Sequence, residues 1–292
     1  MHCRLAAGIL AALAGEARAA PLVVYAAGDI ADCRFSRPAY SGAAATAALV
    51  GPDAQLVLTL GDTTYPKGLA AEFTGCYHPT WGRFKAITRP TPGNHEYYGG
   101  SADGYYGYFG AAAGPRGRGY YSFDAGGWHI ISLNSHMKGE EHQRQLLWLK
   151  DDLARHPARC TLAYWHAPLY SSGGHSANPH MREAWRLLRQ AGAELVLSGH
   201  DHGYERFAPM DAEGRRDAQG LRQFVVGSGG AYLTPFRFVQ PHSEARNNTH
   251  NGVLRLVLGD DGYDWEFVAA PNAVSPEFPE QEAGDRGSAS CQ

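Results

Sequence analysis

The sequence lacks the strong positive charge of proteins that hold nucleic acid on an open surface. Its 26 Lys and Arg are outnumbered by 29 Asp and Glu, which gives a net charge of −3 with histidines neutral. We therefore expect no nucleic-acid-binding surface. After residue 20 the sequence also has no apolar run long enough to cross a bilayer, so no membrane span is expected. It contains no internal repeat.

The first 19 residues have the pattern of a secretory signal peptide. Arg4 supplies a short positive region, Leu5–Ala14 is apolar but too short to span a bilayer, and Ala17–Ala19 fits a small-x-small cleavage site. The alternative is a buried helix of a cytosolic domain. We expect removal of residues 1–19 and a secreted or periplasmic protein.

Short apolar runs bounded by turn residues recur along the rest of the chain and are typical of buried strands. Strands are expected at Leu22–Ala27, Gln55–Leu60, Trp128–Leu133, Leu162–Trp165, Leu195–Leu197, Gln223–Val226, Val253–Leu258 and Tyr263–Val268. Helices are expected at Arg37–Val50, Glu140–Arg155 and Pro179–Ala191. This order predicts a mixed α/β (α+β) fold, with two packed sheets flanked by helices in one domain, residues 20–271. Residues 272–292, rich in Pro, Glu, Gly and Ser, are expected to form a flexible tail.

Five short motifs carry side chains that can bind metal ions, and nearly all follow a predicted strand. They are Gly28-Asp29, Gly61-Asp62-Thr63-Thr64-Tyr65, Gly93-Asn94-His95-Glu96, Tyr164-Trp165-His166 and Gly199-His200-Asp201-His202. Because the carboxyl ends of strands in an open α/β sheet face one crevice, these side chains are expected to meet. Carboxylate, amide, phenol and imidazole groups from distant loops are what a two-metal hydrolytic site needs. Each motif alone is weak evidence for a metal site, but five of them in this order are specific to one.

Cysteine is scarce, and no pair has the Cys-x-x-Cys spacing of a thiolate metal site. Cys3 falls within the predicted signal peptide, and the four others allow three full pairings. Cys33 and Cys76 both lie just past motif-bearing turns, so we expect them to pair and to clamp two loops of the site.

In this order the motifs resemble the calcineurin-like metallophosphoesterase superfamily, and specifically its purple acid phosphatase-like branch. Much of the superfamily has Asp-x-His in the first motif, whereas this chain has Asp29-Ile30-Ala31. Tyr65, in Gly-Asp-x-x-Tyr, is the tyrosine of the purple acid phosphatase pattern. The resemblance extends from Gly28 to about Val268 and implies the superfamily's two-sheet sandwich.

The resemblance also implies a set of metal ligands. Asp29, Tyr65 and His202 would hold one ion, Asn94, His166 and His200 would hold the second, and Asp62 would bridge them through its two carboxylate oxygens. Ferric iron is implied at the Tyr65 site, with zinc, manganese or ferrous iron at the other. A phenol must lose its proton to bind a metal, which agrees with a strongly Lewis-acidic ion there.

Two further histidines are implied to contact substrate. His95 would stabilise charge on the phosphoryl group or protonate the leaving oxygen, and His175 would contact substrate from a Gly-rich loop. The remaining histidines of the mature chain are interpreted as structural or surface residues.

The sequence thus predicts an exported binuclear-metal hydrolase of small-molecule phosphate esters. Hydrolysis of phosphomonoesters by metal-activated water is favoured, and a phosphodiesterase or nucleotidase on the same metals is the alternative. A catalytically inactive binding protein is a third possibility, which the complete ligand set argues against.

The segment from Tyr97 to Tyr121 holds seven tyrosines and eight glycines directly after the third motif. It is either an irregular loop whose aromatic side chains cover a sheet edge, or a rim over the metal site that includes Tyr105, Tyr106 and Tyr108.

Overall fold

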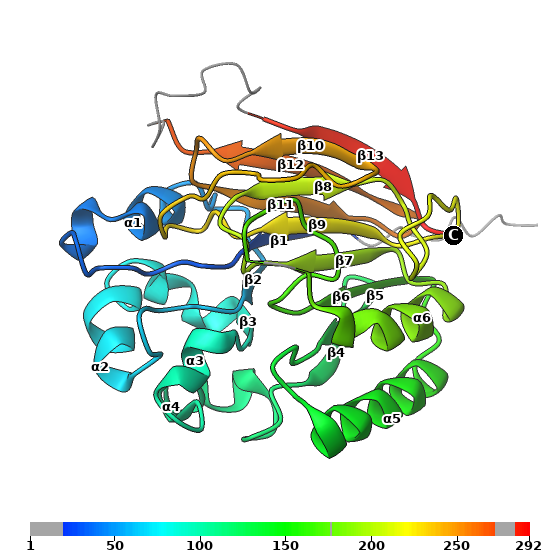
Figure 1. Ribbon diagram of the computed structural model, residues 1–292, viewed down its shortest axis with the longest axis horizontal. Coiled ribbons are helices and arrows are strands. Elements are labelled where there is room, and N and C mark those ends of the chain that lie inside the picture. The colour runs from blue at the N-terminus through cyan, green and yellow to red at the C-terminus, as the bar shows by residue number, and fades with distance from the viewer. Residues whose placement is uncertain (1–19, 176, 272–283) are drawn as a thin grey trace, which may run out of the picture.

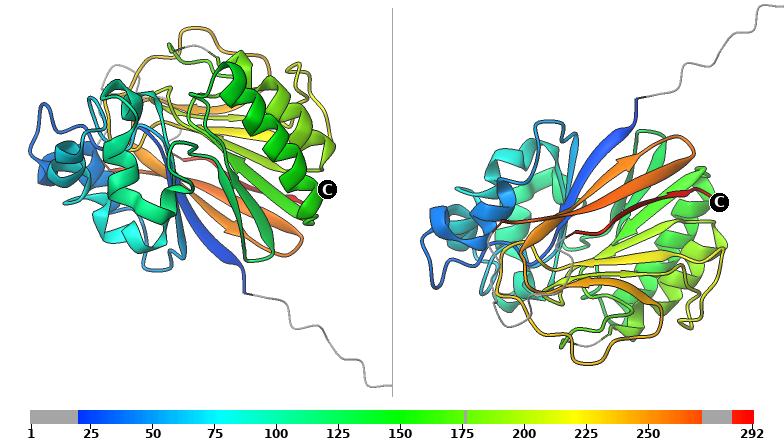
Figure 2. Two further views of the ribbon diagram at one scale, coloured as in Figure 1. Left: turned by 90° about the horizontal axis from the view of Figure 1, so that it is seen from below. Right: turned by 90° about the horizontal axis from the view of Figure 1, so that it is seen from above.

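The computed structural model describes residues 20–175, 177–271 and 284–292. Two β-sheets pack against each other, and helices cover the outer face of each (Figures 1 and 2). This confirms the predicted fold class, a mixed α/β two-sheet sandwich flanked by helices. The predicted signal peptide, residues 1–19, lies outside the described residues. In the part of the chain that is described, no helix combines the length and the apolar character needed to cross a membrane.

The first sheet has six strands in the order β13-β12-β11-β1-β2-β3. Strands β1 (Leu22–Ala27), β2 (Leu56–Leu60) and β3 (Thr88–Thr91) run parallel, and β11 (Gly252–Leu258), β12 (Gly262–Ala269) and β13 (Arg286–Ser290) add an antiparallel meander. All five residues of β2 are buried, as its apolar run predicts for a strand covered on both faces. Buried and exposed side chains alternate along the middle of β12, where the pleat turns every second residue away from the core.

The second sheet has seven strands in the order β10-β8-β9-β7-β6-β5-β4. They are β4 (Tyr121–Ala125), β5 (Trp128–Ser132), β6 (Cys160–Tyr164), β7 (Leu195–Ser198), β8 (Tyr204–Phe207), β9 (Arg222–Val226) and β10 (Ser243–Asn247). Strands β5, β6, β7 and β9 are parallel neighbours, whereas β4, β8 and β10 pair antiparallel. The predicted strands are therefore present, and the sequence analysis missed β3, β4, β8, β10 and β13.

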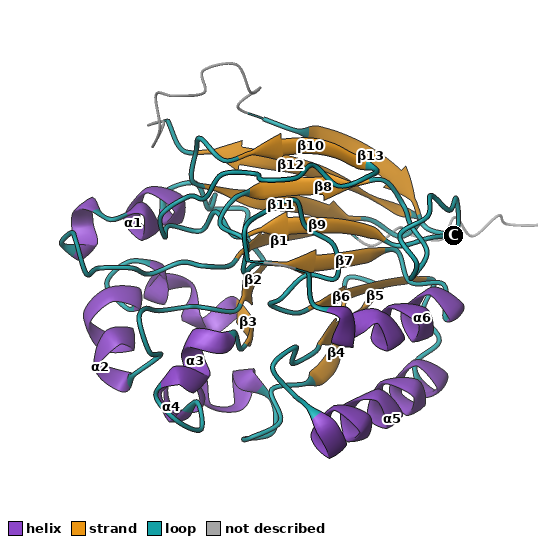
Figure 3. Cartoon of the chain, viewed as in Figure 1, coloured by secondary structure: helices purple, strands orange, loops and turns teal. Residues whose placement is uncertain are grey.

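Helices form the two outer layers (Figure 3). The helices are α1 (Gly42–Ala47), α2 (Ala70–Glu72), α3 (Asn94–Tyr98), α4 (Asp103–Phe109), α5 (Gly139–Arg155) and α6 (Arg182–Gln190). The 3-10 helices are η1 (Pro38–Tyr40), η3 (Trp81–Ile87), η4 (Gly110–Ala113) and η5 (Pro179–Met181), and η2 (Phe73–Tyr77) is a π-helix. The predicted helix at 37–50 forms as η1 and α1, which are separated by Ser41 capping α1.

Three apolar clusters hold the layers together. Leu58, Leu162 and Leu256 belong to the one between the sheets, where they are fully buried. Another joins the second sheet to α5 and α6, with Trp185 at 0% exposure. A third joins the first sheet to α1, η2, η3 and α4, with Trp81 at 0% exposure. Each fully buried side chain of this size contributes roughly 1.5–3 kcal/mol, so burial fixes the strand ends that carry the motifs.

Two disulfides link distant parts of the chain. Cys33–Cys76 confirms the predicted pair and ties the loop after β1 to η2. Cys160–Cys291 joins the start of β6 to the last residues of the chain. Such bonds form and persist in oxidising compartments.

The prediction of a flexible tail is wrong for residues 284–292. The rest of that predicted tail, residues 272–283, lies outside the described residues. Strand β13 pairs antiparallel with β12. Asp285 accepts hydrogen bonds from Tyr204 Oη at 2.6 Å and Arg206 Nε at 2.7 Å. Together with the disulfide at Cys291, these contacts hold a segment whose polar composition alone predicts disorder.

The aromatic segment after the third motif packs inward, so the interpretation as a rim is wrong for the tyrosines that it named. Tyr105 and Tyr106 are buried in the cluster under the first sheet. Tyr108 stacks on Phe73 with ring centroids 5.0 Å apart. Tyr98 is different, because it is 59% exposed and lines the candidate site.

His129 on β5 is a buried imidazole between two carboxylates. Its Nδ1 lies 2.7 Å from Asp124 Oδ1 and its Nε2 lies 3.0 Å from Asp152 Oδ2, with 1% of the side chain exposed. Burial lowers the pKa of His129, but the hydrogen bonds and charges of Asp152 and Asp124 outweigh it and leave the pKa raised. An imidazolium that donates from both nitrogens suits this environment.

Replacing His129 by Gln should lower the free energy of unfolding by about 3 kcal/mol near pH 6, since it breaks a buried ion pair. The folded-state pKa lies above the unfolded value of about 6.5, so this stabilisation is complete below about pH 6.5 and is lost as pH rises through the folded pKa. Urea midpoints of wild type and variant should therefore converge on going from pH 6 to pH 9. The exposed-site control His242→Asn should change neither midpoint, and a pH-independent gap for His129→Gln would refute the ion pair.

Candidate metal centre

The motif side chains meet where the carboxyl ends of both sheets' parallel strands converge. Asp29, Asp62 and Asn94 follow β1, β2 and β3, whereas His166 and His200 follow β6 and β7. The backbone N–H of His200 donates to Asp29 Oδ2 at 2.7 Å, which joins the two sheets at this point. The crevice expected at the strand ends is therefore formed by both sheets together.

Backbone strain is concentrated at these strand ends. Asp29, Asp62 and His200 have φ values of 58°, 47° and 71°, in the left-handed region that residues other than glycine rarely adopt. A Cβ added to Gly93 would lie 2.2 Å from Asp62 Oδ1, so this close approach requires glycine. Strain of this kind persists only where the surroundings impose it, and it is concentrated at functional sites.

Asp29, Tyr65 and His202 form one cluster of ligand atoms. Tyr65 Oη donates to Asp29 Oδ1 at 2.8 Å, and His202 Nε2 lies 3.1 Å from Tyr65 Oη and 3.3 Å from Asp29 Oδ1. The Nδ1–H of His202 donates to the carbonyl of Tyr232 at 2.7 Å, which leaves Nε2 with its lone pair facing the cluster. Burial and the carboxylates of Asp29 and Asp62 raise the pKa of Tyr65 well above its usual value. Only a strongly Lewis-acidic cation would reverse that shift.

A second cluster surrounds His166. Its Nε2 lies 3.1 Å from Asn94 Oδ1, 3.2 Å from His200 Nδ1 and 3.2 Å from Asp62 Oδ2. The Nδ1–H donates to the carbonyl of Leu60 at 2.8 Å and so directs Nε2 toward the other three atoms. Two imidazoles, a carboxylate and an amide oxygen suit a divalent transition metal ion.

Electrostatic interactions within this cluster shift the pKa values of its members in different directions. Burial lowers the pKa of His166, but Asp62 outweighs it and raises the value to about 10. Burial and the neighbouring His166 lower the pKa of His200 to about 4. Burial raises the pKa of Asp62, yet His166 and His95 leave it below its usual value. Asp62 is therefore a carboxylate and His200 a neutral imidazole, which are the forms in which these side chains bind a cation.

Asp62 lies at the junction of the clusters, with its two oxygens in different environments. Oδ1 accepts the backbone N–H of His95 at 2.8 Å, whereas Oδ2 faces His166. The expected bridge through both carboxylate oxygens stays a prediction. Oδ2 is the oxygen that faces the ligand atoms of the second cluster.

Glu96 has a role that the sequence analysis missed. It is 1% exposed and accepts the backbone N–H groups of Asp62 at 2.9 Å, Thr63 at 2.7 Å and Gly93 at 2.7 Å. Burial and the charge of Asp62 raise the pKa of Glu96 to about 7. The signal was its place as the third residue of α3, where a glutamate side chain can accept the backbone N–H of the N-cap residue, here Gly93. Glu96 thus fastens the second motif to the third.

Replacing Glu96 by Ala should lower the free energy of unfolding by about 3 kcal/mol or more, because three buried N–H groups lose their acceptor. Metal affinity should fall by about 10- to 100-fold, as for other residues that orient ligands. Thermal melting and bound-metal analysis would measure both, with the exposed helix-start residue Glu140→Ala as a control. Unchanged metal content in a stable Glu96→Ala protein would refute this positioning role.

The two histidines expected to contact substrate lie next to different ligand side chains. His95 Nδ1–H donates to the Pro66 carbonyl at 2.7 Å, its Nε2 lies 3.8 Å from Asp62 Oδ2, and its ring lies 4.5 Å from both Tyr65 and Tyr98. The His175 ring lies 5.2 Å from those of both His200 and His202. Its backbone N–H donates to Asp201 Oδ1 at 2.8 Å. The structure therefore places both beside the ligand atoms.

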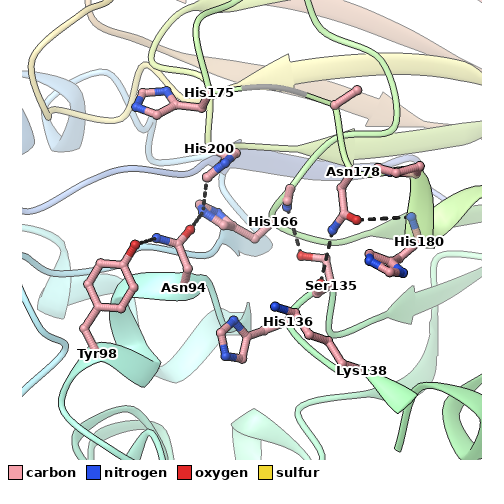
Figure 4. Close-up of a pocket in the computed structure, with 13 residues that line it drawn as sticks. Asn94, Tyr98, Ser135, His136, Lys138, His166, His175, Asn178, His180 and His200 are labelled. Carbon is pink, nitrogen blue, oxygen red and sulfur yellow. Dashed lines mark hydrogen bonds between the residues drawn. The ribbon is translucent and has the colours of Figure 1, made fainter. Parts of the chain in front are cut away.

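A cavity of about 360 Å³ opens directly onto the second cluster (Figure 4). Asn94, His166 and His200 form part of its wall, and His175 and Tyr98 lie beside them. Its volume is in the range of small-molecule sites.

In the part of the chain that the structure describes, two groups of three side chains have ligand atoms within 4.8 Å of one another. One is Asp62, His166 and His200, within the site above. The other is His129, Asp152 and His156, which already forms the ion-pair network described for β5 and α5.

A family model described as calcineurin-like phosphoesterase matches residues 9–204. The chain belongs to this family. The match includes all five motifs, and the predicted superfamily is confirmed.

The curated relatives of this family member include purple acid phosphatases, which confirms the predicted branch. Purple acid phosphatase 15 of Arabidopsis thaliana is 30% identical over 223 residues, which cover 62% of this chain and 41% of the relative. The chain spans less than half the length of the first curated relatives that it matches.

Two solved structures share the fold of this family member. A purple acid phosphatase from yellow lupin seeds has a TM-score of 0.68 at 19% identity, covering 92% of this chain and 54% of that chain. GAP50 of Plasmodium, described as the anchor in the inner membrane complex, has a TM-score of 0.70 at 15% identity, covering 94% of this chain and 90% of that chain. At these identities the likeness concerns the fold alone.

Proposed function

We propose that this protein is an exported, binuclear-metal hydrolase of phosphate esters that acts chiefly on phosphomonoesters. The observation that carries the proposal is the pair of ligand clusters joined at Asp62 beside an open cavity. The disulfides favour the exported location, because such bonds persist in oxidising compartments.

The donor atoms fit two metal ions of different character. Asp29, Tyr65 and His202 would hold ferric iron, and Asn94, His166 and His200 would hold zinc, manganese or ferrous iron, with Asp62 shared between them. When bound, the two ions would polarise the phosphoryl group and lower the pKa of a water molecule.

The other side chains bind and orient the substrate. His95 is aligned by the Pro66 carbonyl and by its tyrosine neighbours, so that Nε2 is held on the site side. A protonated Nε2 can donate its proton to the leaving oxygen. His175, held by Asp201, adds a donor beside His200 and His202.

Metal identity is testable by absorption. Iron-loaded wild-type protein should show a visible phenolate-to-iron charge-transfer band. A Tyr65→Phe variant should lack that band, while Tyr98→Phe, which changes a cavity-lining tyrosine outside the cluster, should keep it. A band that survives in Tyr65→Phe would remove Tyr65 from the ligand set.

The function itself is tested by hydrolysis of an aryl phosphate monoester against the matching diester, with iron and zinc or manganese supplied. We expect the monoester to be preferred. A diester preference would favour the phosphodiesterase or nucleotidase alternative. Hydrolysis of neither ester by protein with two ions bound would favour a binding protein.

A further inference from the structure

The cavity extends beyond the ligand clusters to a wall that carries one lysine and several hydrogen-bond donors. Lys138, His136 and His180 line this wall, and no Asp or Glu is among the described residues that line the cavity. In Figure 4, His136 and Lys138 lie on the side of the cavity opposite His175, and His180 lies at the end away from Tyr98. The metal ligands therefore occupy one part of the cavity and these three side chains another.

Hydrogen bonds join this wall to the second ligand cluster. The backbone N–H of Ala167, directly after His166, donates to Ser135 Oγ at 2.9 Å. Asn178 Nδ2 donates to the Ser135 carbonyl at 3.2 Å, and Asn178 Oδ1 accepts the N–H of His180 at 3.2 Å. The two loops that carry the wall are thus fixed relative to His166.

His136 is held by its own contacts. Its ring stacks on Tyr97, with centroids 4.3 Å apart and planes 6° apart, and its backbone N–H donates to Asn134 Oδ1 at 3.0 Å. Burial and the nearby Lys138 lower the pKa of His136. Lys138 supplies the permanent charge, and His136 is oriented beside it.

The side chains of this wall indicate which class of ligand it can bind. An ammonium and two imidazoles, with no carboxylate among the described residues that line the cavity, suit an anionic oxygen-rich group such as phosphate. A single phosphate held at the ligand clusters leaves the wall unused, because the wall belongs to a different part of the same cavity.

We propose that Lys138, His136 and His180 form a subsite for a second phosphate group on the leaving-group side of the substrate. The preferred substrates are then phosphomonoesters whose alcohol carries another phosphate. This inference rests on the proposed phosphomonoesterase function, and the experiment below separates the failure of one from the failure of the other.

The test compares propanediol bisphosphate with propyl phosphate, which share the reacting ester and differ in the second phosphate. For wild type we expect kcat/KM to be about 10-fold or more higher for the bisphosphate, as charge-assisted hydrogen bonds allow. In Lys138→Ala this ratio should fall about 10-fold, and in Lys138→Arg it should be largely restored. Added salt should lower the wild-type ratio, because Lys138 is solvent-exposed.

The control Lys150→Ala removes an exposed lysine of α5 outside the cavity and should keep the wild-type ratio. A wild-type ratio near one, with propyl phosphate hydrolysed, overturns the subsite and leaves the phosphomonoesterase intact. A high ratio that Lys138→Ala does not change also overturns the subsite. Hydrolysis of neither compound by metal-loaded protein overturns both proposals.

Discussion

Replacing Asp62 by Asn should reduce kcat/KM for an aryl phosphate by about a thousandfold or more, because the site loses several kcal/mol of transition-state stabilisation. The amide keeps the size of the side chain and can still accept the N–H of His95 through its oxygen. It removes the negative charge that the two cations would share. Bound metal, measured after dialysis by elemental analysis, should fall from two ions per chain toward one or none.

The matched control for Asp62→Asn is Asp264→Asn, which makes the same chemical change on an exposed face of β12. It should keep full activity and two ions. Because Asp62 is buried beside His166, the unfolding midpoint of Asp62→Asn must also be measured, so that loss of metal is not confused with loss of fold. A folded Asp62→Asn protein that retains two ions and most of its activity would contradict a bridging role.

The sequence predicted those parts of the fold in which local pattern and tertiary environment agree. Strands β1, β2 and β7 are apolar runs that are buried on both faces, so composition alone locates them and their ends. The same runs end in the glycine-containing turns of the motifs. The resemblance then assigned Asp29, Tyr65 and His202 to one ion and Asn94, His166 and His200 to the other. The structure brings the side chains of each set within hydrogen-bond distance of one another, and their assignment to two ions stays a prediction.

The elements that the sequence analysis missed depend on partners that are distant along the chain. Strand β13 has no apolar pattern, and it is held by β12, by Asp285 and by the disulfide at Cys291. Tyr105 sits in a glycine-rich stretch typical of loops, yet α4 packs it at 0% exposure against the first sheet. Such contacts between distant residues cannot be predicted from the local sequence pattern.

Glu96 shows a similar limit within a motif that was recognised. Its sequence position beside Asn94 and His95 indicated the chemistry of the site, but the three N–H groups that it accepts come from two different loops. A buried carboxylate that binds backbone N–H groups stabilises the strained turn at Asp62 without contacting substrate. The metal centre therefore depends on a residue whose contribution is to backbone geometry.

Replacing His95 by Ala should leave two ions bound and lower kcat by about 100-fold or more, as expected when a general acid is removed. The separation of metal binding from rate follows from geometry: the ring donates to the Pro66 carbonyl and packs between Tyr65 and Tyr98, whereas it contributes no atom to either ligand cluster. Metal analysis and steady-state kinetics on the same preparation would measure both.

The dependence on leaving group distinguishes a proton donor from a residue that merely supports the site. Loss of a general acid matters most for a poor leaving group, so the His95→Ala deficit should be large for an alkyl phosphate and small for the phosphate of an acidic phenol. A deficit that is equal for both esters would indicate that His95 acts by orienting the phosphoryl group. The exposed His242→Asn control should behave as wild type with both substrates. Depletion of metal in His95→Ala would contradict the division between ligand and acid, because the ring would then be required to hold the ligand clusters together.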